Sequence, residues 1–424
     1  MPLVRVPHAV GRGTPAALSV GPRCGGERLS RFELVRRAAD VATPYSRRLV
    51  LVNRTDVRTI PFFNYPGLFA RQREEILSTV ERVFAAGKLI MQEDLEQFEV
   101  NLAQYLGAKH AFGVGNGTDG LLIALIAAGV GRGDEVILPS HTFIATGAAV
   151  HHSGAIPVLA DCRDDHLIDP ASVRAKVTKR TKAIVPVQLN GRTCEMDRLQ
   201  EIAEEHGLVI VEDAAQGLGS EYRGRKAGTF GRAAMFSFYP AKVLGCFGDG
   251  GGVVTDDDQI ADRIKTLRNH GRMDDGDVSG WCFNSRLDNL QAALLDLKLK
   301  SFPEEVRRRR EIAAVYQERL AAIGALRLPP SPRSDARHFD VYQNYEVEAH
   351  RRDELRDHLK ANGVHTILQW GGKALHHFPA LGFTVDLPIT ERIIARSLLL
   401  PMNTSLTDDD VSYICDLIDA FYRN

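Results

Sequence analysis

The chain has 424 residues, of which 44% are hydrophobic and 25% are charged, and these proportions exclude a disordered or fibrous protein. Its 53 Lys and Arg residues nearly balance 54 Asp and Glu residues, so the net charge of −1 provides no field that would hold nucleic acid or anionic lipid. The six cysteines form no CxxC pair, and the longest strongly apolar stretch, residues 121–130, is shorter than the roughly 20 residues of a membrane span. We therefore expect a cytoplasmic α/β protein with no metal site, no membrane partner and no nucleic-acid partner.

Residues 1–60 differ in composition from the rest of the chain. They contain eleven arginines, no lysine and four acidic residues, with scattered Gly and Pro and no apolar block typical of a secretory signal. The acidic residues Glu27, Glu33 and Asp40 disfavour an organelle transit peptide. We interpret residues 1–60 as a disordered extension, or as translation from a start codon upstream of the real one, and expect no catalytic contribution from them.

From residue 62 onward the apolar pattern is regular. Helical spacing predicts helices over residues 71–86 and 93–106, the second ending at Gly107. Helical stretches then alternate with short apolar runs, which predict strands at residues 111–114, 135–138, 156–160, 183–188, 208–211, 233–238 and 252–255. This alternation indicates an α/β domain over residues 61–305, with a mostly parallel central sheet covered by helices on both faces.

The pattern changes after residue 305. A charged helix over residues 304–320 leads to a proline-rich turn, and beyond it we expect a strand at residues 342–347 and helices at 352–362 and 408–422. These elements predict a smaller C-terminal α+β domain over residues 306–424. The basic run at residues 307–310 is interpreted as a solvated helix face.

Two features near predicted strand ends suggest a phosphate and a flat ring. The sequence GVGNGTDG (residues 113–120) enters an apolar helix, and backbone N–H groups at a helix start bind anions, although a tight turn alone would also explain the glycines. It matches neither GxxxxGK[ST] nor GxGxxG, which disfavours nucleoside triphosphate and dinucleotide sites. Phe143 follows the second strand, where it would stack on a ring or fill the core.

Two charged residues also follow buried strands. Burial of the Asp213 carboxylate at such a position costs free energy unless it meets a cation or a strong donor. A helix N-cap is the ordinary explanation for an Asp there. Lys242 lies beside a run of glycines, where burial would make its neutral amine a nucleophile, although most lysines lie at the surface. Together with the phosphate cradle and the aromatic ring, the pair matches the needs of pyridoxal phosphate (PLP): a Lys for the Schiff base and an Asp that keeps the pyridine nitrogen protonated.

Several long stretches strengthen this interpretation. In chain order they are GNGTDGLLIAL, LPSHTFIAT, VEDAAQGLGS, SFYPAKVLGCFGDGGGVVT, LRNHGR and FNSRLDNLQAALLDLKL. They resemble the DegT/StrS family of nucleotide-sugar aminotransferases, which are PLP enzymes of the aspartate aminotransferase fold, from about residue 61 to the C-terminus. The chain departs from the family pattern at residues 188–192, which read Gln-Leu-Asn-Gly-Arg where relatives commonly have His and Tyr-Gly, and this affects the substrate contacts expected there.

The resemblance implies roles for individual residues. Lys242 would carry the Schiff base and shuttle the proton, and Asp213 would pair with the pyridine nitrogen. The other residues implied to bind the cofactor are Gln216 near its 3-hydroxyl, Phe143 on its ring, Ser237 and the turn Gly117, Thr118 and Asp119 at its phosphate, and Asn284, which would reach the phosphate from the neighbouring subunit of a homodimer with shared active sites.

The expected function is transfer of an amino group from an amino acid, with glutamate ranked first, to a keto group of a nucleotide-linked sugar. The resemblance ranks C3 first, 4-keto sugars second and cyclitol ketones third. A dehydratase is disfavoured because Lys242 is present where such relatives have His. A PLP-fold protein that serves in regulation or assembly without transamination is disfavoured by the intact set of Lys242, Asp213 and Ser237. A Ser–His–Asp hydrolase is disfavoured because no GxSxG sequence is present.

Overall fold

The computed structural model describes residues 58–423, so nearly all of the segment over residues 1–60 for which we predict disorder lies outside the described residues. Ile60, at the end of that segment, is buried and pairs with Val364 in a short parallel bridge. Among the described residues, no helix has both the length and the apolar character that a membrane span requires.

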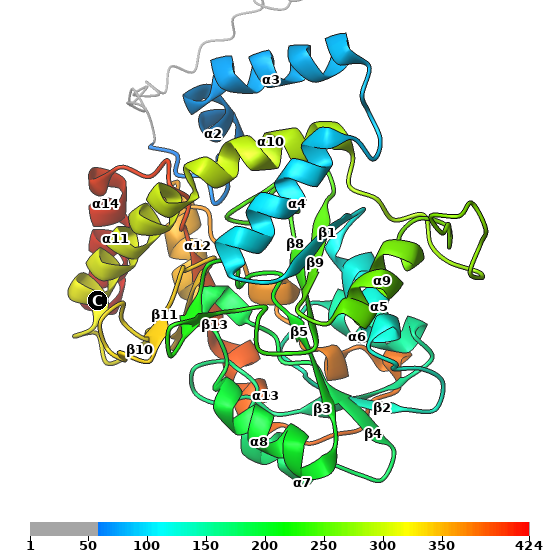
Figure 1. The fold of residues 1–424 in the computed structure, drawn as a ribbon. Coiled ribbons are helices and arrows are strands. Elements are labelled where there is room, and N and C mark those ends of the chain that lie inside the picture. Colours follow the sequence, from blue (N-terminus) through cyan, green and yellow to red (C-terminus); the bar gives the residue numbers. More distant parts are fainter. Residues whose placement is uncertain (1–57, 424) are drawn as a thin grey trace, which may run out of the picture. The chain divides into compact units, whose positions relative to one another are not determined.

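The central sheet has seven strands in the order β1-β9-β8-β5-β4-β2-β3 (Figure 1). The strands are His110–Val114 (β1), Glu135–Pro139 (β2), Ile156–Ala160 (β3), Thr181–Ile184 (β4), Val209–Asp213 (β5), Ala233–Ser237 (β8) and Gly251–Thr255 (β9). Strand β9 is antiparallel to both of its neighbours, and the other pairings are parallel. The prediction of a mostly parallel sheet built from these seven segments is confirmed.

Helices cover both faces of this sheet because alternate strand residues point to opposite sides. In β8, Ala233 and Met235 join the core under α5, whereas Ala234 and Phe236 join the core under α4. The first face carries Gly117–Ala127 (α5), Ile144–His152 (α6) and Asp258–Leu267 (α9). The second carries Glu93–Leu106 (α4), Pro170–Ala175 (α7), Met196–His206 (α8) and Asn289–Lys300 (α10).

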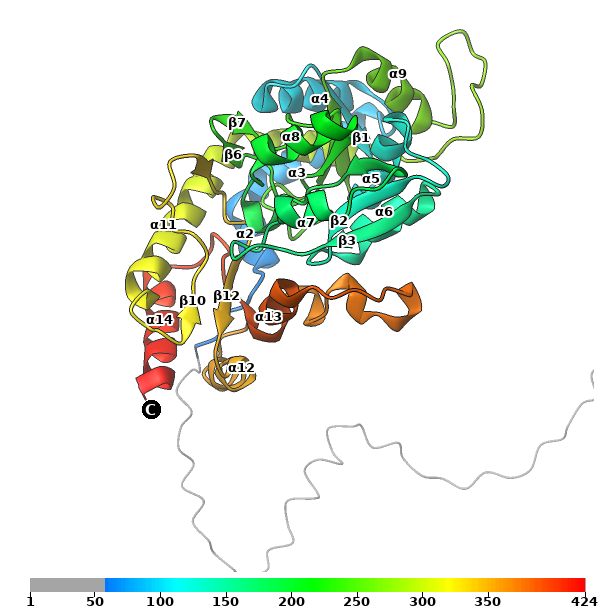
Figure 2. The same ribbon diagram turned by 90° about the horizontal axis from the view of Figure 1, so that it is seen from below.

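The C-terminal residues build a second layer around a three-stranded antiparallel sheet (Figure 2). Its strands are Leu326–Arg327 (β10), Tyr345–Ala349 (β12) and Ser397–Leu400 (β13), and its helices are Arg352–Ala361 (α12), Pro388–Arg396 (α13) and Asp408–Arg423 (α14). The predicted boundary between residues 305 and 306 falls inside α11 (Phe302–Leu320). The start of α11 packs in the core under α4, through Phe302 and Val306, and its later residues, from Ile312, pack in the C-terminal core.

The remaining elements are short or peripheral. The predicted helix over residues 71–86 is observed as Arg73–Ala86 (α3). A short helix that was not predicted, Tyr65–Arg71 (α2), precedes it and is separated from it at Gln72. A third sheet joins Glu221–Tyr222 (β6), Arg225–Lys226 (β7) and His338–Phe339 (β11). It therefore ties a segment of the C-terminal part to the loop that follows β5.

The interpretation of residues 307–310 as a solvated helix face is wrong for part of the run. Arg309 is buried, and its guanidinium donates to the carbonyl oxygens of Tyr342 and Gln343 at 3.1 and 3.2 Å. Arg310 donates to the carbonyl oxygen of Asp340 at 2.7 Å. Burial lowers the pKa of Arg309 to about 10, with partial compensation from Glu305. These contacts fix the irregular segment that leads into β12.

Candidate active site

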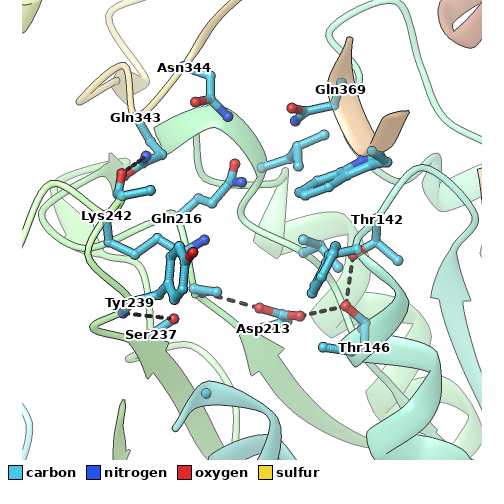
Figure 3. A pocket seen from close by; sticks show the side chains of 18 of the residues that line it. Thr142, Thr146, Asp213, Gln216, Ser237, Tyr239, Lys242, Gln343, Asn344 and Gln369 are labelled. Atoms are coloured by element: carbon cyan, nitrogen blue, oxygen red, sulfur yellow. Dashed lines mark hydrogen bonds between the residues drawn. The ribbon is translucent and has the colours of Figure 1, made fainter. Parts of the chain in front are cut away.

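A cavity of about 680 Å³ lies where the parallel strands of the central sheet end. Its floor is formed by Asp213 of β5, Ser237 of β8 and Lys242 just beyond β8, and its opposite wall by Gln343 and Gln369 of the C-terminal part (Figure 3). Parallel strands place their carboxyl ends at one edge of a sheet, and ligands of such proteins bind at that edge. The cavity therefore occupies the position that the topology favours.

Strand β9 explains why distant residues meet on this floor. Because it runs antiparallel, it begins at the edge where β1 and β8 end, and Gly251 pairs with Val114 on one side and with Ser237 on the other. The turn that follows Val114 opens α5 at Gly117, so the helix start lies beside Ser237, about 120 residues away in the chain.

The start of α5, Ser237 and Gly251 form a cradle for an anion. A Cβ atom on Gly117 would lie 3.0 Å from the Cβ of Ser237, and one on Gly251 would lie 2.6 Å from the carbonyl carbon of Asn116, so neither position has room for a side chain. The side chain of Asn116 accepts from the N–H of Asp119 at 2.9 Å, which caps the helix. The earlier N–H groups of the helix have no intrahelical partner, and Gly117 and Thr118 line the cavity.

Asp213 is a buried carboxylate, 4% exposed, at the floor of the cavity. Its oxygens accept from the hydroxyl of Thr146 at 2.7 Å and from the N–H of Ala215 at 3.1 Å. The single hydroxyl proton of Thr146 is used by Asp213, so Thr142, 2.7 Å from Thr146, donates to Thr146 in turn (Figure 3). Burial raises the pKa of Asp213, while these two donors and the charge of Lys242 oppose that rise. A carboxylate held in this way favours a cationic partner in the cavity.

Lys242 lies opposite Asp213 in a turn that follows β8. Burial lowers the pKa of Lys242 to about 8, and the negative charge of Asp213 offsets part of this effect. Gln343 holds the turn from the other wall: its Oε1 accepts from the N–H of Val243 and its Nε2 donates to the carbonyl of Ala241, both at 2.8 Å. The residues on either side of Lys242 are thus anchored to the C-terminal part, which fixes the backbone from which its side chain enters the cavity.

Phe143 and Gln216 complete the cavity between floor and wall. Phe143 immediately precedes α6, is 54% exposed, and presents its ring to the cavity 5.5 Å from the ring of Trp370. The Oε1 atom of Gln216 accepts from the backbone N–H of Asn190 at 2.7 Å, and the rest of its amide lines the cavity. An open aromatic face and an oriented amide are therefore available to a planar ligand.

Seven of the nine residues for which the sequence predicts cofactor contacts line this one cavity: Gly117, Thr118, Phe143, Asp213, Gln216, Ser237 and Lys242. Asp119 lies one residue further along α5, and its N–H is used by Asn116. Asn284 is exposed and pairs with Asn269 in a segment outside the cavity lining. Because Asn284 was predicted to act in a neighbouring subunit, its contact with phosphate stays a prediction.

Sequence reasoning missed other residues of the cavity. Thr146 follows Thr142 by four residues, a spacing that places two side chains on one side of a helical turn. This spacing was the one weak sign in the sequence that Thr146 could reach the same site as Asp213. Gln343, Asn344, Gln369 and Trp370 left none, because they reach the cavity through the packing of the C-terminal part and belong to no local motif.

The residues present fit PLP. The cradle formed by the start of α5 and Ser237 matches a phosphate, Asp213 matches a protonated ring nitrogen, Phe143 matches an aromatic ring, and the amine of Lys242 matches an aldehyde. The seven-stranded sheet with one antiparallel strand holds these groups at a single edge. Fold and site together define a PLP-dependent enzyme of the aspartate aminotransferase fold.

Comparison with known proteins agrees with this class. The sequence profile of the DegT/DnrJ/EryC1/StrS aminotransferase family matches residues 70–419, and the chain belongs to that family. The predictions of family, fold, enzyme class and cofactor are thereby confirmed.

Three curated relatives illustrate the range of the family. The dTDP-3-amino-3,4,6-trideoxy-alpha-D-glucose transaminase of Streptomyces venezuelae is 39% identical, over 86% of this chain and 97% of its own. The pleiotropic regulatory protein of Geobacillus stearothermophilus is 38% identical, over 86% and 99%. The UDP-2-acetamido-2-deoxy-3-oxo-D-glucuronate aminotransferase of Pseudomonas aeruginosa is 36% identical, over 84% and 98%.

Two solved structures share the fold. The S. venezuelae protein DesV, crystallised in complex with a ketimine intermediate, superposes with a TM-score of 0.83 at 39% identity, covering 86% of this chain and 99% of that one. The protein ntda of Bacillus subtilis, with bound cofactor pmp, superposes with a TM-score of 0.81 at 28% identity, covering 88% and 87%.

Proposed function

We propose that this protein transfers an amino group from an amino acid, with glutamate as the first candidate, to the C3 keto group of a nucleotide-linked sugar. The observation that carries the proposal is the placement of Lys242 opposite the buried Asp213 in a cavity with an anion cradle. The C3 position is supported by relatives from two species whose names specify a 3-amino or a 3-oxo sugar. A 4-keto sugar and a cyclitol ketone rank below it.

Bound PLP supplies an aldehyde that captures amines and a protonated ring that withdraws electrons from the carbon next to the captured nitrogen. Lys242 acts first as the amine that holds this aldehyde. With a pKa of about 8, the Lys242 amine is neutral in about half of the molecules at pH 8, whereas an ordinary lysine is neutral in less than about 1% of them. Once the amino-acid donor has displaced it, the free Nζ would take the proton from the donor α-carbon and deliver it to C4′ of the cofactor. In the second half-reaction the same amine would take a proton from C4′ and deliver it to the sugar carbon that receives the amino group.

Asp213 would stabilise positive charge on the ring nitrogen, and the donors on its oxygens favour its ionised form and oppose the effect of burial on its pKa. The backbone N–H groups at the start of α5 and the hydroxyl of Ser237 bind the phosphate. Ser237 Oγ accepts from the N–H of Tyr239 at 3.3 Å, which leaves its own proton to donate. These groups fix both ends of the ring, so that the donor α-carbon is presented to Lys242.

The wall opposite the sheet edge is suited to a sugar. Asn344 and Gln369 carry amides to the cavity, and Phe63 and Trp370 add apolar surface. Amides recognise hydroxyl groups as donors and acceptors, and aromatic rings pack on the C–H faces of sugars. The volume of about 680 Å³ is in the range of pockets that hold a ligand of this size.

The first test is the half-reaction with glutamate. Purified protein loaded with PLP should lose the visible absorbance of the lysine-bound cofactor when glutamate is added, and Lys242→Ala should show neither that absorbance nor turnover. Lys265→Ala, which removes an exposed lysine paired with Asp274, serves as the control and should behave as wild type. Retained transamination by Lys242→Ala would overturn the proposal. Failure of the wild-type protein to react with any amino acid would favour the regulatory alternative, which one relative's name raises.

The carbon that is aminated is tested separately. Nucleotide-linked 3-keto and 4-keto sugars and a cyclitol ketone are each mixed with the aminated form of the enzyme, and return of the lysine-bound absorbance is followed. We expect the 3-keto sugar to react fastest. A faster reaction with a 4-keto sugar or a cyclitol would reassign the substrate and leave the chemistry of Lys242 intact.

We also propose that the enzyme works as a homodimer with shared sites. The segment over residues 268–285 extends away from the sheet between α9 and α10 (Figure 1). It carries exposed apolar side chains, among them Trp281, which is fully exposed, and Val278. Exposed apolar groups of this size are typical of an interface, and Asn284 lies in the same segment.

Mixed dimers test the sharing. Lys242→Ala and Asn284→Ala subunits are each expected to be impaired alone. Mixed together, they should recover activity, because each mixed dimer has one site with both native residues. No recovery on mixing, or a monomer in light scattering, would contradict shared sites.

A cytoplasmic location forms the last part of the proposal. The cysteines described by the structure, Cys162, Cys194, Cys246, Cys282 and Cys415, are all free thiols. Free thiols are typical of a reducing compartment. Fractionation of cells that express the native gene would test this, and recovery of the protein in an extracytoplasmic fraction would contradict it.

A further inference from the structure

A buried charged cluster lies next to the cavity and takes no part in the chemistry proposed above. It consists of His141, which follows β2, His166, which precedes α7, and Glu346 of β12. Glu346 Oε2 lies 3.0 Å from Nδ1 of His166 and 3.3 Å from Nε2 of His141, and all three side chains are buried. The cluster joins a strand of the C-terminal part to loops at the edge of the central sheet.

His166 and Glu346 of the cluster carry opposite charges at neutral pH. Burial by itself would lower the pKa of His166, but the carboxylates of Glu346 and Glu348 outweigh it and raise the pKa to about 9. Burial would raise the pKa of Glu346, but the two imidazoles outweigh it and hold that pKa well below its usual value. The carboxylate of Glu346 is therefore a fixed negative charge inside the protein.

Two histidines and a carboxylate are also a familiar metal-binding set, but the hydrogen bonds around Glu346 favour a different role. Its carboxylate accepts from Asn190 Nδ2 at 2.6 Å and from the hydroxyl of Ser397, in addition to the two imidazoles. With donors on both oxygens the carboxylate is satisfied without a cation.

Asn190 connects this cluster to the cavity. Its side-chain Nδ2 donates to Glu346, and its backbone N–H donates to Oε1 of Gln216 at 2.7 Å. Its φ of +56° lies in the left-handed region, which Asn tolerates better than most residues with a side chain. One residue in a constrained turn therefore contacts both the buried charge and the amide that faces the ligand.

The orientation of both amides follows from these contacts. Asn344 Nδ2 and Gln369 Nε2 donate to Oδ1 of Asn190 at 3.1 and 3.2 Å, so the Asn190 amide cannot rotate without losing donors on one side and Glu346 on the other. Because the Oε1 atom of Gln216 is occupied by the Asn190 N–H, its Nε2 is the group left to face the cavity (Figure 3).

We propose that Asn190 is a positioning residue, held by the charged cluster of Glu346, His166 and His141, which directs the Gln216 amide N–H toward the 3-oxygen of the bound cofactor. This inference rests on the proposed function, because it assumes PLP in the cavity. The buried carboxylate of Glu346 accepts from the side-chain amide of Asn190 and so holds the turn that contacts Gln216. A hydrogen bond to the 3-oxygen stabilises its ionised form and so affects the pH at which the bound cofactor changes its absorbance.

The experiment compares two carboxylates of the same strand. Glu346→Gln removes the charge that holds Asn190. Glu348→Gln is the matched control, because Glu348 is also buried on β12 and also contacts His166, at 3.5 Å, but it bonds Arg392 instead of Asn190. Asn190→Gly provides an independent variant that folds readily, since glycine adopts a positive φ without strain and only the side chain is lost.

Two quantities are measured on each protein: the dissociation constant of PLP from the apo-protein, and the midpoint pH of the absorbance change of the bound cofactor. We expect Glu346→Gln and Asn190→Gly to weaken PLP binding about tenfold and to raise the midpoint by about half a pH unit or more, and Glu348→Gln to stay within about twofold of wild type. Should Glu346→Gln not fold, Asn190→Gly decides alone.

Wild-type values for Asn190→Gly in both measurements would overturn the inference, and so would equal shifts in Glu346→Gln and Glu348→Gln. These outcomes are distinct from failure of the proposed function, in which wild-type protein would itself show no Lys242-dependent absorbance with PLP. Tight binding of Zn²⁺ by the wild-type protein, lost in Glu346→Gln, with an unchanged midpoint in Asn190→Gly, would also overturn it in favour of a metal site.

Discussion

The two sides of the cavity are built in different ways. The floor consists of Asp213, Ser237 and Lys242, which end a strand or follow one, and their positions follow from the pairing of β9, β8 and β5. The wall consists of Gln343, Asn344, Gln369 and Trp370, which lie in irregular segments held by side-chain amides and by Arg309. A rigid floor suits a cofactor common to a whole family, and a wall made of loops can vary with the substrate.

The largest expected loss of activity comes from a substitution in the floor, Asp213→Asn. The amide has the same size but no charge to stabilise a protonated ring nitrogen, so the rate of the glutamate half-reaction should fall about 1000-fold, which is about 4 kcal/mol in activation free energy. Single-turnover measurements of the cofactor absorbance give this rate. Asp274→Asn, which changes an exposed carboxylate paired with Lys265 outside the cavity lining, is the control. A loss of less than about tenfold in Asp213→Asn would contradict the assigned role.

The second prediction concerns pH and the amine of the floor. Because burial lowers the pKa of Lys242 to about 8, the nucleophilic neutral form accumulates as the pH rises through 8. The rate at which apo-protein captures PLP should therefore rise about tenfold between pH 7 and pH 9 and then level off. Stopped-flow absorbance over pH 6 to 10 measures it. A rate that continues to climb tenfold per pH unit up to pH 10 would show that the pKa of this lysine is not lowered.

A substitution in the wall should weaken binding of the keto sugar and leave the reaction with the amino-acid donor nearly unchanged. Trp370→Ala removes apolar surface that lines the cavity and packs beside the ring of Phe143, and we expect KM for the keto sugar to rise about five- to tenfold. The glutamate half-reaction, followed in the same preparation, should change less than about twofold. Equal effects on both half-reactions would mean that the wall also positions the cofactor and would end the distinction between the two sides.

The smallest expected effect tests the support beneath Asp213. Thr146→Val keeps the shape of the side chain and removes the 2.7 Å hydrogen bond to Asp213, so the rate of the glutamate half-reaction should fall about two- to fivefold. Thr142→Val removes a bond one step further away and should have a smaller effect. If Thr142→Val is the more damaging of the two, the direction of donation assigned here is wrong.

The difference between floor and wall also decides what the sequence could predict. Asp213 and Ser237 are the last residues of their strands, and Gly117 and Lys242 lie within five residues of one, so strand periodicity and composition were enough to bring them to the same edge. The buried strands themselves were predicted to within three residues at most of their ends, except for the C-terminal end of β4, because short apolar runs leave little choice of pairing.

The wall could not be predicted because its geometry depends on tertiary contacts. The predicted strand over residues 342–347 is observed as β12 at Tyr345–Ala349, and the residues just before it, Gln343 and Asn344, turn toward the cavity. The carbonyl oxygens of Tyr342 and Gln343 are taken by the buried guanidinium of Arg309, which prevents that segment from joining the sheet. The helical spacing places Arg309 on the face of α11 that carries Val306 and Ala313, but the charge of the four-arginine run led to the prediction of a solvated face.

The insertion of β9 between β1 and β8 has a consequence for biosynthesis. The phosphate cradle needs Gly117, Ser237 and Gly251 together, and the turn that carries Lys242 is held by Gln343. The cofactor therefore has no complete binding site on a nascent chain until more than three-quarters of the polypeptide has left the ribosome. Cofactor uptake should therefore be a late event that marks completion of synthesis, and chains interrupted ahead of position 343 should emerge colourless.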